Sequence, residues 1–170
     1  MDTRGFLKIL GNYAILVLLQ AMLLNNINIS PLGITPMFYV LAILVMPFET
    51  AGWLQLVFAF LLGFSIDIFS DTLGLNAAAS VLAAFIRPTI LKTLAPRDGY
   101  ESGTAPYASY MGMNWFAKYS IIIIIIHHFT FFMLNAFGFE NFSQTLLRIV
   151  FTSLLTFAFI ILSQFIAFRK

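Results

Sequence analysis

The sequence contains no cysteine and few charged residues, and these two absences exclude several classes of protein. Because none of the 170 residues is cysteine, the chain forms no disulfide and has no thiol for catalysis or metal binding. Charged residues make up 9% of the chain, whereas soluble domains carry about 25%. The net charge of +2 is too small to indicate binding to nucleic acid.

Apolar side chains are what the sequence has in excess. They make up 61% of the chain, and the mean hydropathy is +0.94. A water-soluble core of this size cannot bury so much apolar surface, so the composition predicts a polytopic membrane protein. We expect a single all-α transmembrane domain over residues 1–170. The first apolar run is long and lacks a small-x-small cleavage site, which predicts an uncleaved first span.

Hydropathy delimits six predicted spans. They cover approximately residues 8–27, 32–48, 51–69, 74–95, 114–136 and 142–168. The second has the weakest support, because its strongly apolar part lies between Pro36 and Pro47. That part is short against the ~20 residues that a helical span needs.

Basic residues decide the expected topology. With the N-terminus in the cytoplasm, all of these basic residues fall at cytoplasmic ends: Arg4, Lys8, Lys92, Arg97, Lys118, Arg169 and Lys170. The opposite connections, near 28–31, 70–73 and 137–141, contain no Lys or Arg. This is the positive-inside pattern, and it predicts six spans with both termini cytoplasmic. The outer corners then hold Asp67, Asp71 and Glu140.

The segment GFSIDIFSDTLGLNA, residues 63–77, carries the most informative pattern in the chain. Asp67 ends a long apolar run, and Asp71 follows four residues later. A charge near a bilayer is kept only where it faces protein, water or a partner charge. The run breaks at Ser70–Thr72 and resumes after Gly74. This predicts a helix, a tight turn and a second helix, with ionisable groups at the corner.

The helix that follows this corner has a polar and small-residue face. Asn76, Ser80, Ala83 and Arg87 are spaced so that they share one side of a helix. We expect this side to pack against other helices, with Arg87 extending toward the cytoplasm. Small residues that would let helices approach closely are Gly63, Gly74, Ala77 and Ser80.

Arg148 is a cation on the side of the membrane where cations are otherwise absent. It repeats with Gln144 and Thr152 every four residues, about two turns from the predicted outer end of its span. A cation at this depth needs a partner. Asp67 has a similar predicted depth, so we expect Asp67 and Arg148 to be electrostatically coupled.

Neither catalysis nor a bound cofactor has positive support. His127 and His128 are adjacent, so they point about 100° apart on a helix, whereas a chelating pair is spaced i, i+4. We therefore predict no metal site and expect one of the two to line the bundle. The other would face lipid or a partner. The chain also has no Gly-rich phosphate loop and no recognisable Ser/His/Asp constellation.

The only sizeable polar connection is Ala95–Met113. Its glycines and prolines argue against regular structure. Tyr100, Tyr107 and Tyr110 suit a cytoplasmic loop with aromatic side chains at the headgroup level. The same loop could alternatively be a docking site for a cytoplasmic partner.

The order of short, closely connected spans and the corner motif resemble the rod-shape-determining membrane protein family MreD. The family's G-x-x-x-D corner followed by L-G-x-x-A/S matches this chain at Gly63, Asp67, Leu73, Gly74 and Ala77. The resemblance implies a six-helix bundle like that of the S components of energy-coupling-factor vitamin transporters. It also implies a non-catalytic role in the bacterial inner membrane.

The resemblance further implies partners. These are a bitopic MreC-like protein and, indirectly, the actin-like MreB and the RodA synthase with its penicillin-binding protein. Membrane lipid is a further expected partner, and formation of a homo-oligomer is also possible. The fold likeness leaves a second hypothesis, a substrate-binding carrier for a small molecule. The short outer connections favour the scaffold over the carrier.

Overall fold

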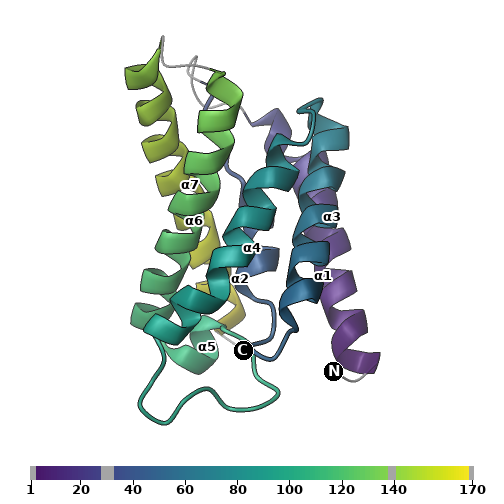
Figure 1. The fold of residues 1–170 in the computed structure, drawn as a ribbon, viewed down its shortest axis with the longest axis vertical. Coiled ribbons are helices and arrows are strands. Elements are labelled where there is room, and N and C mark those ends of the chain that lie inside the picture. Colours follow the sequence, from purple (N-terminus) through teal and green to yellow (C-terminus); the bar gives the residue numbers. More distant parts are fainter. Residues whose placement is uncertain (1–2, 28–32, 138–140, 169–170) are drawn as a thin grey trace.

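The structure is a computed structural model that describes residues 3–27, 33–137 and 141–168 (Figure 1). All regular secondary structure in these ranges is helical. The elements, in chain order, are α1 (Thr3–Met22), η1 (Leu24–Asn26), η2 (Phe38–Val40), α2 (Leu41–Leu44), α3 (Gly52–Ser70), α4 (Leu75–Thr93), α5 (Ala108–Met111), α6 (Met113–Ala136) and α7 (Phe142–Phe168), where η marks a short 3-10 helix.

Three helices of the described chain, α3, α6 and α7, are long and apolar enough to cross a membrane. This confirms the prediction of an all-helical chain and is consistent with a membrane protein. Helix α6 runs through six consecutive isoleucines, residues 121–126, although β-branched residues form helices less readily than leucine. In a bilayer the helix is nevertheless favoured, because it satisfies every backbone polar group within the segment.

The expected spans 8–27 and 74–95 correspond to helices that are not among these three, α1 and α4. Helices α1 and α4 have 20 and 19 residues. Helix α4 is less apolar than α3 because it carries Asn76, Ser80, Arg87 and Lys92. Each of the predicted spans 51–69, 74–95, 114–136 and 142–168 coincides with a helix whose ends lie within two residues of the expected ones.

The expected second span, 32–48, is not a continuous helix. Within the described part of it, the chain is helical only from Phe38 to Leu44. Pro36 and Pro47 bracket this short piece, and proline both lacks the donor that a helix requires and disfavours helical conformation in the residue before it. Residues 33–51 nevertheless run from one end of the bundle toward the other (Figure 1).

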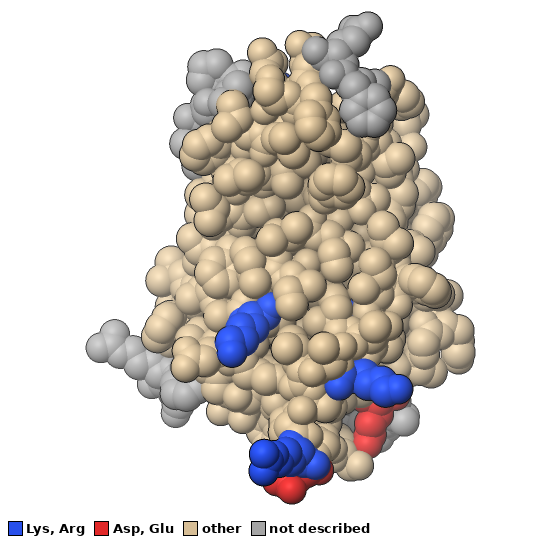
Figure 2. Space-filling model, turned by 60° about the vertical axis from the view of Figure 1, so that its left-hand side comes forward, with Lys and Arg blue, Asp and Glu red and all other residues tan. Residues whose placement is uncertain are grey.

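The two ends of the bundle differ, and we name them by their connections. The corner end carries the turn between α3 and α4, and the loop end carries the long connection between α4 and α5 (Figure 1). Helix α1 begins and helix α7 ends at the loop end. On the face drawn in Figure 2, the visible Lys and Arg side chains lie in the lower half, toward the loop end.

Helix α4 is the centre of the packing. It contacts α3 on one side and α6 on the other, and α6 in turn contacts α7. Alanines on α4 allow this close packing, and Ala79 and Ala83 are completely buried. The short piece η2–α2 fills the interior, where Val40, Ile43 and Leu44 are also completely buried.

Candidate functional site

The corner between α3 and α4 is organised around the carboxylate of Asp67, which is 5% exposed. Its Oδ1 accepts hydrogen bonds from the backbone N–H and the side-chain Nδ2 of Asn76, both at 3.0 Å. Oδ1 also accepts from Thr72 Oγ1 at 2.5 Å, and Oδ2 accepts from the backbone N–H of Ala77 at 2.9 Å. The carboxylate of α3 therefore caps the N-terminus of α4, where a negative charge is favoured.

The turn itself uses left-handed backbone. Asp71, which ends α3, has φ 53°, Leu73 has φ 46° and Gly74 has φ 88°. Nothing lies within 4 Å of the position of a Cβ on Gly74, so its conformation, rather than close packing, is what requires glycine there. The expectation that Gly74 lets helices approach closely is therefore wrong.

Gly63 is the residue that brings α3 and α4 together. A Cβ at this position would overlap the backbone of Ala77 and the carbonyl oxygen of Asn76. Ala77 is 4% exposed and faces Gly63 across this contact. The two residues act as a pair of small contacts, as expected from their size.

A hydrogen-bonded chain continues from the corner into the bundle. Tyr39 donates from its hydroxyl to Asn76 Oδ1 at 2.7 Å, and the same hydroxyl lies 2.9 Å from His127 Nε2. Ser80 Oγ lies 3.4 Å from that nitrogen. The predicted polar face of α4 is thus buried against α6 and against Tyr39 in residues 33–51.

Both histidines are completely buried, so the expectation that one of them faces lipid or a partner is wrong. His128 Nδ1 donates to the carbonyl oxygen of Ile124 at 2.8 Å. Its Nε2 lies 3.0 Å from Thr156 Oγ1 on α7 and is left as an acceptor. No group of three or more potential metal-ligating side chains occurs within the described residues.

The expectation that Arg87 extends toward the cytoplasm is wrong. Its side chain is completely buried. Its Nε donates to the Tyr119 hydroxyl at 2.8 Å, and its Nη1 donates to Gln55 Oε1 at 3.0 Å. Its Nη2 donates to the carbonyl oxygen of Met46 in a short hydrogen bond. Helix α4 continues past the neighbouring Pro88 to Thr93.

The interrupted segment, residues 33–51, is held by polar side chains from several helices. Gln20 on α1 donates from Nε2 to the carbonyl oxygen of Pro36 at 2.9 Å. Thr156 on α7 accepts from the backbone N–H of Met37 at 2.9 Å. Tyr119 on α6 donates to the carbonyl oxygen of Leu44 at 3.1 Å. Together with Arg87, these side chains replace the hydrogen bonds that a helix would have made within itself.

Arg148 does not pair with Asp67, contrary to our expectation. No ion pair joins these two described residues, and both carboxylate oxygens of Asp67 are bound at the corner. Arg148 lines two neighbouring cavities of about 450 and 480 Å³ at the corner end. Its Nε is buried without a hydrogen-bond partner among the described residues.

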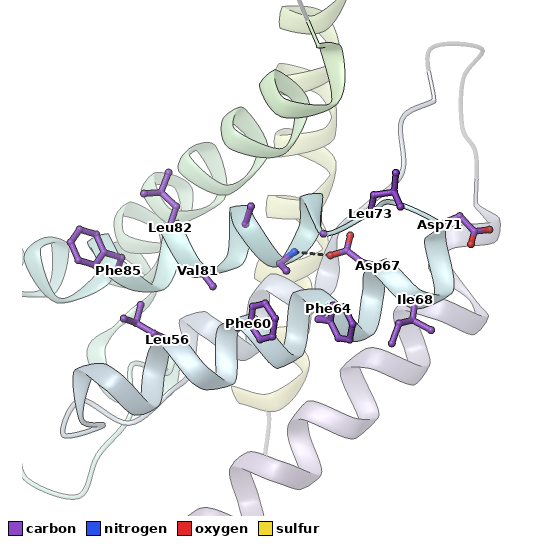
Figure 3. Close-up of a pocket in the computed structure, with 13 residues that line it drawn as sticks. Leu56, Phe60, Phe64, Asp67, Ile68, Asp71, Leu73, Val81, Leu82 and Phe85 are labelled. Atoms are coloured by element: carbon purple, nitrogen blue, oxygen red, sulfur yellow. Dashed lines mark hydrogen bonds between the residues drawn. The ribbon is translucent and has the colours of Figure 1, made fainter.

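An apolar groove of about 910 Å³ lies on the outside of α3 and α4 (Figure 3). Phe60 and Phe64 project from α3, and Val81 and Phe85 project from α4. The corner carboxylates lie at one end of the groove. Phe64 is 46% exposed, so the groove is open to whatever surrounds the protein.

The polar loop packs on the loop end through Tyr100. Its hydroxyl donates to the carbonyl oxygen of Leu91 at 2.7 Å, and its ring stacks on Phe48 with centroids 4.0 Å apart. Burial raises the pKa of Tyr100 to about 12, so the hydroxyl keeps its proton at neutral pH. Tyr100 is therefore packed against the protein, whereas Tyr110 is exposed.

Sequence reasoning missed several residues that organise the interior. These are Tyr39, Tyr119 and Thr156. Each is a polar group within a long apolar run, and in a bilayer that alone indicates a hydrogen-bond partner in the protein.

Comparison of the chain with protein-family models, with curated proteins and with solved structures finds no match.

Proposed function

We propose that the protein is a non-catalytic scaffold of the bacterial cell-wall elongation machinery, of the MreD type. In this proposal it lies in the inner membrane with both termini in the cytoplasm. It holds the transmembrane helix of a bitopic MreC-like partner and thereby supports rod shape. Actin-like MreB and the RodA synthase with its penicillin-binding protein act further along the same assembly.

The corner between α3 and α4 is the observation that carries this proposal. Four of the five residues that support the family resemblance have a structural task there. Gly63 and Ala77 set the helix contact, Asp67 caps α4, and Gly74 provides the left-handed turn. The result is a closely packed and capped pair of helices, which suits a docking platform.

The apolar groove beside this corner is the proposed contact surface. It runs along both helices and is lined mainly by aromatic and aliphatic side chains (Figure 3). In a membrane, helices associate through close packing of such surfaces. The distribution of basic residues supports the orientation, because the connection at the loop end carries Arg97 whereas residues 70–73 of the corner carry no cation.

Filling the groove tests the proposal. Ala78 is exposed and lines the groove, so Ala78→Phe changes its shape without entering the core. We expect this variant to co-purify with about fivefold less MreC-like protein, a loss of ~1 kcal/mol, and to produce rounded cells. The matched control is Ala158→Phe, an exposed alanine on α7. Equal partner recovery for both variants would contradict docking in this groove.

A second candidate function, a carrier for a small molecule, is favoured by the two polar cavities at the corner end. Their volumes, about 450 and 480 Å³, lie within the range of ligand pockets. A carrier would retain a stoichiometric water-soluble ligand that is released on denaturation. Mass spectrometry of the denatured, purified protein separates the candidates, because the scaffold should release none.

A further inference from the structure

A cationic site that is separate from the α3–α4 groove lies between α6 and α7. The cavity of about 480 Å³ lies between the end of α6 and the start of α7, and we name it the α6–α7 cavity. Its polar lining is formed by Asn135, Asn141, Gln144, Thr145 and Arg148. Arg148 is the only charged residue among the described residues that line it.

The guanidinium of Arg148 is set into this cavity without a counter-charge from the described residues. Its Nε is buried and has no hydrogen-bond partner among them. Its Nη2 lies 4.0 Å from the position that a Cβ on Gly33 would take. Asp71 is the only carboxylate lining the neighbouring cavity, among the described residues, and it forms no ion pair with Arg148. The guanidinium is thus partly buried, and no described residue neutralises it, so an anionic ligand would stabilise this arrangement.

The neighbouring amides favour an oxyanion over a simple halide. Asn135 and Gln144 line the cavity, and neither side chain hydrogen-bonds to another described residue. Amide N–H groups and a planar guanidinium together match several oxygens on one phosphorus atom. Arg148 is six residues into α7, which places its Cα about 9 Å along the helix from Phe142. That depth is comparable to the boundary between lipid headgroups and hydrocarbon.

We propose that the α6–α7 cavity binds a phosphate group through Arg148, with Asn135 and Gln144 as additional donors. The phosphate belongs to a membrane lipid headgroup or to a small soluble phosphate, and both present the same oxygens. The site is separate from the α3–α4 groove and does not depend on the scaffold proposal.

Native mass spectrometry of the full-length protein in neutral detergent tests the site. The probes are dioleoylphosphatidylglycerol, dioleoylglycerol with the same tails and no phosphate, and inorganic phosphate. We expect the wild type to bind a phosphate-bearing probe, and Arg148→Gln to bind it about tenfold more weakly, as for loss of a charged hydrogen bond. The control, Arg97→Gln, changes an exposed cation at the loop end and should bind as the wild type does.

The probes distinguish the two sources of phosphate. Binding of phosphatidylglycerol alone identifies a lipid headgroup, and binding of inorganic phosphate identifies a soluble ligand. Equal binding of phosphatidylglycerol and dioleoylglycerol would overturn the proposal. So would undiminished binding by Arg148→Gln, or a wild type that binds neither phosphate-bearing probe.

Two further variants keep the test decisive if Arg148→Gln fails to fold. Gln144→Leu and Asn135→Leu remove the proposed amide donors at exposed positions and leave the guanidinium in place. Each should weaken phosphate binding by about threefold to tenfold, because one hydrogen bond from an uncharged amide donor is lost. Unchanged binding by both variants would exclude the α6–α7 cavity as the site.

Discussion

The helical pair α3–α4 and residues 33–51 both run between the two ends of the bundle, but they satisfy their backbone polar groups in opposite ways (Figure 1). The pair forms its hydrogen bonds within two continuous helices, and Asp67 closes the corner between them. The interrupted segment instead depends on side chains of α1, α4, α6 and α7. In an apolar surrounding, both solutions work only if every group finds a partner.

The largest expected effect comes from Arg87, which serves the interrupted segment. Arg87→Met leaves Met46, Gln55 and Tyr119 without the donor that they now share. We expect the free energy of unfolding to fall by about 3 kcal/mol or more, because several buried polar groups lose a partner together. Circular dichroism during heating in detergent micelles measures the loss.

The control for this prediction lies on the same helix. Lys92→Met removes an exposed cation and should leave the melting temperature nearly unchanged. If both variants melt together, the hydrogen bonds of Arg87 do not hold the interrupted segment.

The next effect concerns the helix contact of the continuous pair. Gly63→Ala adds a Cβ that overlaps the backbone of α4, so the two helices must move apart. We expect a loss of about 1–3 kcal/mol, typical of overpacking. Gly52→Ala is the control, since nothing lies within 4 Å of its added Cβ. A Gly63→Ala protein as heat-stable as Gly52→Ala would show that the contact is not tight.

A smaller effect should follow from neutralising the cap of α4. Asp67→Asn keeps the shape of the side chain but loses its negative charge and one acceptor oxygen. We expect the free energy of unfolding to fall by about 1–2 kcal/mol. Hydrogen exchange at the backbone amides of Asn76 and Ala77 should be faster. Asp71→Asn changes an exposed residue of the same turn, and asparagine tolerates its left-handed backbone. Equal exchange in the two variants would contradict the capping role.

The smallest effect compares two threonines one turn apart on α7. Thr156 accepts from the backbone of Met37, whereas the buried Oγ1 of Thr152 has no partner among the described residues. Thr156→Val should cost about 1 kcal/mol, and Thr152→Val should be neutral or stabilising. Chemical denaturation of both variants in the same detergent gives the difference. If Thr152→Val lowered the free energy of unfolding more than Thr156→Val, α7 would not hold the interrupted segment.

The contrast between these regions also explains what the sequence could predict. Hydropathy located α3, α6 and α7 because each is a long apolar run whose helical state follows from the solvent. The same signal at residues 37–46 correctly indicated burial but not conformation. Hydropathy reports where a segment lies, and the partners of Met37, Leu44 and Met46 are distant in the sequence.

The candidate site divides in the same way. The helix–turn–helix form of the corner was predictable, because the residues that break the helix at 70–74 are close in sequence, whereas the cap that Asp67 forms with Asn76 was not predicted. The partners of Arg87 and Arg148 were not predictable from depth alone. Depth places two side chains in the same layer, but helix rotation and packing decide whether they meet.

The interrupted segment also constrains how the protein is made. Residues 33–51 leave the ribosome before Arg87, Tyr119 and Thr156 have been synthesised, yet these residues supply its hydrogen bonds. Until then, lipid cannot solvate its backbone, so the segment must stay in water or in the insertion machinery. We therefore expect this early part of the chain to be among the last to reach its final place, once α7 has been synthesised.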